Sequence, residues 1–139
     1  MVQAVEGVVF PWLDPSRYSF ALGIEAGGAT GLAGQTASRH DPATGRVISG
    51  GTATEQARIC WDKIEAVLDA ANRGVEECTE VVEYLTAAGL DAREEIAGAR
   101  RASVTPSTMV VDALVRPDAS LEVEVVAGGP PHQVRLPQL

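Results

Sequence analysis

The chain of 139 residues carries 11 basic and 19 acidic residues, a formal net charge of −8, and 45% of its residues are hydrophobic. This is enough for one domain with a buried core, and the negative charge disfavours binding to a phosphate backbone. No stretch approaches the roughly 20 apolar residues of a membrane helix, and the N-terminal residues lack the pattern of a signal peptide. We therefore expect a cytoplasmic protein that binds neither nucleic acid nor a membrane.

The chain offers few ligands for a metal ion and no framework of disulfides. Its cysteines are Cys60 and Cys78, and its histidines, His40 and His132, lie far apart in polar sequence. Structural zinc sites need four such ligands, and catalytic sites need three. We therefore expect no metal.

The first fifty residues favour β-structure. Residues 2–10 are apolar with few breaks, and residues 18–24 alternate large apolar with small side chains, so both are predicted strands. The glycines of residues 26–29 predict a turn into a third strand over residues 30–36, which makes a hairpin. Residues 40–45 are predicted to form a surface turn.

The pattern then changes to a helical period. Apolar residues recur at spacings of three and four through residues 57–71, and Thr52 followed by Glu55 matches a capping box. A helix over residues 52–71 is therefore expected. Cys60 lies on its apolar stripe and is predicted to belong to the core.

The remaining elements are shorter. Strands are predicted over residues 78–86, 108–115 and 121–126, and a helix rich in Ala, Glu and Arg over residues 90–101. Three prolines in residues 128–139 indicate a C-terminal tail.

The predicted order is βββαβαββ, which indicates an α+β fold with one mixed sheet and two helices packed on one face. Residues 1–127 form a single predicted domain, followed by the tail. Because the helices cover only one face of the sheet, we expect the other face to be covered in an oligomer.

Six segments, in this order and at these spacings, resemble the RidA family, also called YjgF-like or endoribonuclease L-PSP. The segments are residues 18–23, 31–36, 41–47, 56–71, 78–86 and 121–125. The resemblance covers roughly residues 15–127. It implies a chorismate-mutase-like fold and a homotrimer with clefts between subunits. It also implies hydrolysis of reactive enamines and imines to ketones and ammonia, without a cofactor or a metal.

The resemblance assigns a catalytic role to Glu122, which matches the glutamate thought to orient or activate the attacking water. Burial in a cleft would raise the pKa of this carboxyl toward the range useful for acid–base catalysis. Periodicity alone would place Glu122 and Glu124 on a solvated strand face, and for Glu124 we keep that interpretation. Tyr18 matches a tyrosine that lines the cleft and binds substrate, although it could be an ordinary strand aromatic.

The sequence departs from the family pattern at the substrate site. Ser107 stands where active deaminases carry an arginine that binds the substrate carboxylate, and serine supplies neither the charge nor the planar fork. Ser107 and Thr108 could be plain residues at the start of a strand after a proline. Alternatively, their hydroxyls and the backbone N–H groups of Ser107, Thr108 and Met109 bind a polar group of the substrate. We expect their strand to pair with that of Glu122. Ala33 replaces a serine of the family's substrate site.

Other residues are open candidates for a part in the cleft. Arg100 or Arg101 could supply the missing charge, although a pair at a helix end also favours the helix dipole. Glu94 or Glu95 falls near the place of a family asparagine. Trp12, or the C-terminal tail, could cap the cleft.

Three functions remain open from the sequence. The first is an enamine or imine deaminase with altered substrate choice rather than a standard deaminase of 2-imino acids. The second is a pathway-specific tautomerase, dehydratase or cyclase of a biosynthetic intermediate, with Glu122 as the proton shuttle. The third is a non-catalytic trimer that binds a small ligand.

Overall fold

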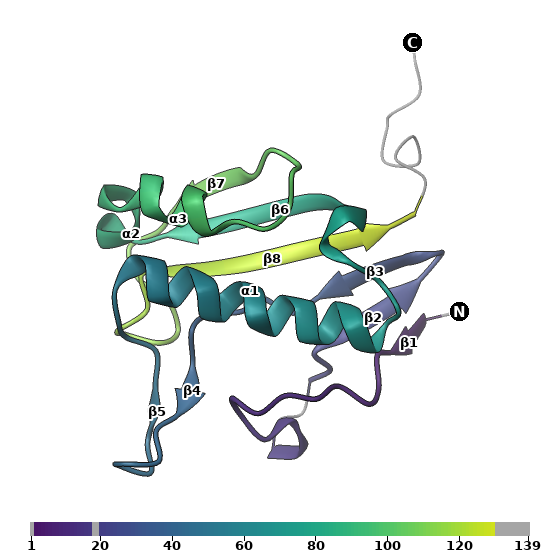
Figure 1. Ribbon diagram of the computed structural model, residues 1–139, viewed down its shortest axis with the longest axis horizontal. Helices are drawn as coiled ribbons and strands as arrows, with labels where there is room; N and C mark the ends of the chain where they lie inside the picture. Colours follow the sequence, from purple (N-terminus) through teal and green to yellow (C-terminus); the bar gives the residue numbers. More distant parts are fainter. Residues whose placement is uncertain (1, 18–19, 130–139) are drawn as a thin grey trace.

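The computed structural model describes residues 2–17 and 20–129 and has an α+β architecture (Figure 1). Its strands are β1 (Val2–Ala4), β2 (Gly23–Ala26), β3 (Ala29–Leu32), β4 (Arg39–His40), β5 (Val47–Ile48), β6 (Cys78–Leu85), β7 (Ser107–Val110) and β8 (Leu121–Gly128). Its α-helices are α1 (Ala53–Ala70), α2 (Ala87–Asp91) and α3 (Arg93–Ala99), and two 3₁₀ turns occupy Pro15–Arg17 and Val75–Glu77.

Six strands form one mixed sheet in the order β1-β2-β3-β8-β6-β7. All neighbours pair antiparallel except β6 and β7, which are parallel. The predicted hairpin is confirmed as β2 and β3, joined by Gly27 and Gly28. Both glycines have positive φ, 60° and 82°, as a two-residue hairpin turn requires.

Helix α1 confirms the predicted helix almost to the residue. The Thr52 hydroxyl accepts a hydrogen bond from the backbone N–H of Glu55 at 3.1 Å and so caps the first turn. The helix ends at Ala70, and Asn72, with φ of 59°, turns the chain away. Figure 1 shows α1 running along β8, with β2 and β3 beside it.

The core lies between α1 and the sheet. Alternate residues of β8 point toward the helix and are buried, while the residues between them are half-buried on the other face. The fully buried residues that meet here are Ala57, Cys60, Trp61, Ile64, Val67 and Leu68 of α1 and Leu121, Val123, Val125 and Ala127 of β8. This alternation places Glu122 and Glu124 on the face opposite α1, which we call the open face.

The second predicted helix is divided in two. Residues 90–101 were expected to be one helix, but the chain enters α2 directly after β6, and α3 follows a break at Ala92. Gly89 of α2 packs so closely on the Ser120 carbonyl oxygen that a Cβ would collide with it. The break lets α2 stay against this oxygen while α3 packs on α1 through the buried Ile96.

Several strands are shorter than predicted, because each continues only while a neighbour pairs with it. Strand β1 stops at Ala4, and Val5 makes the last bond, to the Gly23 carbonyl at 2.9 Å. Strand β7 stops at Val110, after which Val111 donates to the Leu85 carbonyl. Strands β2 and β3 likewise cover only part of predicted residues 18–24 and 30–36.

Candidate functional site

Glu122 lies on the open face of the central strand β8. In the register of β6 and β8, Tyr84 stands directly opposite Glu122, and Val82 opposite Glu124. The two carboxylates therefore follow each other along one face of the sheet. Both are half-buried.

A cavity of about 280 Å³ opens beside Glu122. One wall is apolar and comes from the loop that connects β1 to β2, and the opposite wall comes from the chain after β3. We call it the Glu122 cavity. Its lining residues are Phe10, Leu13, Pro15, Phe20, Leu22, Gly34, Gln35, Thr36, Ser38, Val115, Arg116 and Glu122.

Gly34 allows the Glu122 carboxyl to take its place in the cavity. A Cβ on residue 34 would lie 2.6 Å from the Glu122 Oε2 atom, so any other residue here would force the Glu122 carboxyl to move. The next residue, Gln35, exchanges two backbone hydrogen bonds with Val123, of 2.8 and 2.9 Å, and so fixes residues 34 and 35 against β8.

The surroundings of Glu122 favour its protonated form. Burial raises the pKa of this carboxyl above its usual range, and the charge of Glu124 raises it further. Among the described residues no group donates a hydrogen bond to Glu122 or forms an ion pair with it. The pKa shift within one chain has the direction expected for a carboxyl in a cleft, and the carboxyl is available to a bound molecule.

Lys63 of α1 forms hydrogen bonds to the polar wall of the cavity. It is fully buried on α1, and its Nζ donates to the Thr36 carbonyl at 2.9 Å and the Ser38 hydroxyl at 3.0 Å. The Nζ also lies 5.5 Å from the centroid of the Phe10 ring. Burial lowers the pKa of Lys63 to about 8. The sequence reasoning missed this residue, although its spacing from Cys60 puts it on the apolar stripe of the helix.

Arg116 is the other charged residue of the cavity, and the sequence reasoning missed it as well. It belongs to the loop between β7 and β8, which carries no periodic pattern. No motif marks this position, so only the folded chain shows that it lies in the same cavity as Glu122.

The predicted substrate-binding residues of β7 lie farther from Glu122 than expected. Ser107 was predicted to lie on a strand paired with that of Glu122, and this is wrong, because β6 lies between β7 and β8. Strands β7 and β8 are therefore two strand spacings, about 10 Å, apart. The parallel register places Ser107 and Met109 on the open face with Glu122, and Thr108 on the opposite face. All three are exposed, and none lines the cavity.

Two further predicted residues give different results. The Ala33 backbone N–H donates to the Leu22 carbonyl at 2.9 Å, so Ala33 lies next to the cavity without lining it. Tyr18 lies outside the described residues, and its role stays a prediction.

The candidate replacements for the missing arginine are engaged elsewhere. Arg100 forms two hydrogen bonds of 2.8 Å to the buried carboxylate of Glu83. Arg101 bridges Asp62 and Glu65 of α1, at 2.7 and 2.6 Å. These bonds attach the end of α3 to β6 and α1 and leave neither guanidinium free for a ligand.

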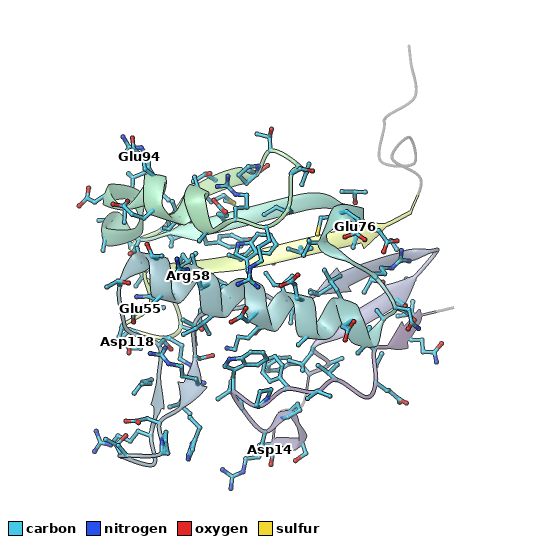
Figure 2. The ribbon with its side chains drawn as sticks, in the orientation of Figure 1. Asp14, Glu55, Arg58, Glu76, Glu94 and Asp118 are labelled. Carbon is cyan, nitrogen blue, oxygen red and sulfur yellow. The ribbon has the colours of Figure 1, made fainter. Side chains whose placement is uncertain are left out.

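The remaining candidates also lie away from the cavity. Glu94 and Glu95 are exposed on α3, and Figure 2 shows Glu94 at the outer edge of the molecule. Trp12 packs edge-on against Phe10, with ring centroids 5.1 Å apart, and is not a lining residue. The tail, residues 130–139, lies outside the described residues.

The cysteines show no sign of nucleophilic activation. Cys60 is fully buried in the core, as predicted, and burial raises the pKa of its thiol to about 12. Burial raises the pKa of Cys78 to about 11, with the charges of Glu76 and Glu77 adding to it. Across residues 2–17 and 20–129, no three His, Cys, Asp or Glu side chains are grouped to hold a metal ion. In the same part of the chain, no helix is long and apolar enough to cross a membrane.

The sequence from residue 14 to residue 128 matches the family model described as Endoribonuclease L-PSP. The chain belongs to this family. The fold and the family expected from the sequence are thereby confirmed, and membership of the RidA/YjgF family supports a function that involves a small molecule. A comparison with curated protein sequences gives no significant match.

Solved structures of other family members share the fold. TdcF from E. coli with bound serine has a TM-score of 0.71 at 21% identity, covering 92% of this chain and 99% of TdcF. YyfA of the Rid family from Yersinia pestis has a TM-score of 0.72 at 21% identity, with coverages of 93% and 100%. The E. coli yjgF gene product has a TM-score of 0.69 at 19% identity, with coverages of 91% and 98%.

Proposed function

We propose that this RidA-like protein is an enzyme that hydrolyses a reactive enamine or imine in the Glu122 cavity. The observation that carries the proposal is the state of the Glu122 carboxyl. It lies in a largely apolar cavity, has a raised pKa and has no protein partner among the described residues. The raised pKa brings this carboxyl closer to the range in which a side chain exchanges protons with water or substrate.

The chemistry needs only water and a group that moves protons. An enamine first takes a proton on carbon while its nitrogen gives one up, and so becomes the imine. Water then adds across the C=N bond, its oxygen to carbon and a proton to nitrogen. The C–N bond breaks as the hydroxyl proton passes to the leaving nitrogen, which gives a ketone and ammonia. Glu122 would accept the proton of the attacking water and return it to the nitrogen.

The β7 strand argues against the usual substrates of the family. The resemblance assigns carboxylate binding to an arginine at position 107, where this chain has a neutral serine. The structure of TdcF contains bound serine, which supports a ligand of amino-acid size for this fold. We infer that the substrate here does not present a carboxylate to position 107.

We also propose that the enzyme works as a homotrimer. In support, no helix of the described residues covers the open face of the sheet, and this face carries the half-buried Val82 and Tyr84 and the 52% exposed Met109. Glu122, which lies on this face, also lines the cavity. A neighbouring subunit on this face would shield the cavity from bulk water and leave Ser107–Met109 available to its rim.

The decisive experiment compares Glu122→Gln with Glu80→Gln. Imines and enamines generated in the assay are scored by release of ammonia. Glu122→Gln keeps the shape of the side chain but cannot exchange protons, and a positioned acid or base contributes about 100-fold or more, so kcat should fall by at least roughly that factor. Glu80→Gln removes the same charge from an exposed position outside the cavity and should leave kcat unchanged.

Measurements of protein stability and of the reaction product distinguish the proposed hydrolysis from the alternative functions. Burial raises the pKa of Glu122, so its ionised form costs folding free energy, and the glutamine variant should unfold no more easily than the parent at neutral pH. Turnover that depends on Glu122 without release of ammonia would identify a tautomerase or cyclase. Ligand binding without any turnover would identify a binding protein.

A further inference from the structure

Among the described residues that line the Glu122 cavity, Arg116 is the positively charged one. This stands out on a chain with a net charge of −8, because most charged side chains here are carboxylates. The residue lines the cavity together with Val115, while Glu122 lines it from the sheet. A cavity with both signs of charge and apolar walls can orient a small amphipathic molecule.

The backbone around Arg116 is held in place from three sides. The Arg116 carbonyl accepts the N–H of Ala119 at 3.0 Å, and Ala119 is buried. The Asp118 carboxylate accepts the N–H of Ser49 at 2.9 Å, just before α1 (Figure 2). The Ser120 N–H donates to the Gln56 side chain at 2.8 Å. The loop therefore presents Arg116 to the cavity from an anchored turn.

The guanidinium itself has no partner among the described residues. Several other arginines, in contrast, form hydrogen bonds within the protein. Arg39 bonds the Ala37 and Gly50 carbonyls, Arg73 bonds the Gly28 carbonyl and Glu77, and Arg100 bonds Glu83. Those arginines tie segments together, whereas Arg116 has its donors free for a ligand.

Arg116 and Glu122 stand apart within the cavity. They form no ion pair. The charge of Arg116 lowers the pKa of Lys63, beneath the polar wall, whereas burial and Glu124 account for the raised pKa of Glu122. A ligand can therefore use both groups only if its anionic group and its reacting carbon are separated.

We propose that Arg116 binds the carboxylate of an acidic substrate whose apolar body lies along Phe20 and Leu22 and whose reacting carbon lies at Glu122. This rests on the proposed function and adds the substrate class. The substrate is an acid with an apolar spacer between the carboxylate and the enamine or imine carbon. Guanidinium binds carboxylate bidentately, so the pair supplies orientation as well as affinity.

Binding of two matched probes tests this without requiring turnover. Isocaproate carries a carboxylate on a branched apolar body, and isocaproamide has the same shape without the charge. Calorimetry with the intact protein at neutral pH should show isocaproate binding at least about tenfold more tightly than the amide. Arg116→Gln should abolish this preference, and Arg116→Lys should restore part of it, because the charge returns without the fork.

Arg46→Gln is the matched control, since it removes the same charge from the exposed turn between β4 and β5, outside the cavity. It should keep the preference. Equal affinity for the acid and the amide, no binding of either at about 10 mM, or a preference that survives Arg116→Gln would each overturn the proposal. These outcomes are independent of ammonia release, so failure here leaves the proposed reaction standing, and failure of the reaction leaves this binding site standing.

Discussion

Glu83 of β6 and Glu122 of β8 lie on opposite faces of the sheet, and their surroundings give them different roles. Glu83 faces the helices, is 2% exposed and is held by two hydrogen bonds of 2.8 Å from Arg100. Its charge is neutralised in place, which makes it a structural residue. Glu122 faces the cavity and lacks such a partner among the described residues, so the energetic cost of its charge is not offset. An uncompensated carboxyl of this kind is typical of a functional site.

The serine at position 107 predicts poor hydrolysis of the imine derived from alanine, which carries its carboxylate directly on the reacting carbon. Loss of a bidentate ion pair costs on the order of 3 kcal/mol, so kcat/KM should be at least roughly 100-fold below that of a relative with the arginine. Ser107→Arg should raise this activity. An assay with freshly generated imine measures both.

Thr108→Arg is the control for that substitution. It adds the same side chain one residue further along β7, on the opposite face of the sheet. It should leave the activity low. Turnover by the parent protein at the level of an arginine-bearing relative would contradict the prediction and show that another group holds the carboxylate beside Glu122.

At the scale of elements, α1 shapes the cavity through the polar contacts of one residue, Lys63, on its buried face. The chain after β3 leaves the sheet, and the buried Thr36 and Ser38 follow the helix instead of a strand. Lys63 bonds the carbonyl of one and the hydroxyl of the other. Because the ammonium of Lys63 lies under Phe10 as well, one helix residue joins both walls of the cavity.

This contact predicts that stability rises as the pH is raised from about 8 to 9. The pKa of Lys63 is about 8 in the folded chain against an ordinary 10.5, so above pH 8 the unfolded chain binds one proton more. The titration of Lys63 alone then contributes about 1 kcal/mol over this interval, and the thiols of Cys60 and Cys78, with their raised pKa values, offset part of it. Urea unfolding at a series of pH values should show the rise, and Lys63→Met should remove it.

Above pH 9 the same measurement should turn downward. The thiols of Cys60 and Cys78 have pKa values of about 12 and 11 in the folded chain against an ordinary 9.0. The unfolded chain loses these protons first, which favours unfolding. The free energy of unfolding should therefore peak near pH 9, and a steady decline from pH 8 onward in the parent protein would contradict the assignment of Lys63.

At the scale of the whole molecule, the two faces of the sheet carry different kinds of residue. The side toward α1 holds the core, whereas the open face carries carboxylates, Tyr84 and the exposed end of β7. Edge strands with free backbone groups invite pairing with another chain, and β7 is an edge strand whose four residues are all exposed. Both features favour an assembly in which copies of the chain meet at this face.

Light scattering at micromolar concentration should give a mass about three times 14.5 kDa. Met109→Glu places a charge on the open face and should reduce the mass toward that of a single chain. Thr108→Glu, on the opposite face of the same strand, should leave the assembly intact. A stable mass of 14.5 kDa for the parent protein would contradict both the trimer and a cavity shared between subunits.

Local patterns were sufficient to predict the helix α1, the β2–β3 hairpin and the alternation of β8. Each depends on residues close in sequence, such as Thr52 beside Glu55, or Gly27 and Gly28 between two strands. The extent of β1 and β7 depends on where a distant partner strand stops, so their ends could not be read from the sequence. The position of β6 between β7 and β8 also depends on pairing between distant strands, so it could not be read from the sequence either.

The candidate site was predicted only in part, for a similar reason. Glu122 could be singled out because a family resemblance marks it and the strand periodicity gives its face. Arg116 lies in an aperiodic loop, and its approach to the cavity depends on bonds from Ser49 and Gln56, each more than sixty residues away in the chain. Lys63 could have been found, since the helical period alone places it among the buried residues.

Lys63 is the only lysine of the chain, and it is wholly inaccessible. Reagents that acylate ε-amines can therefore reach this protein's single target only when the packing between α1 and residues 36–38 opens. The rate at which Lys63 is acylated therefore measures how often this packing opens. Amide hydrogen exchange gives the same kind of information, but acylation is irreversible and reports on one residue. A bound ligand that holds the walls of the cavity together should slow the acylation of Lys63. Ligand binding to the cavity can then be measured even before a substrate is known.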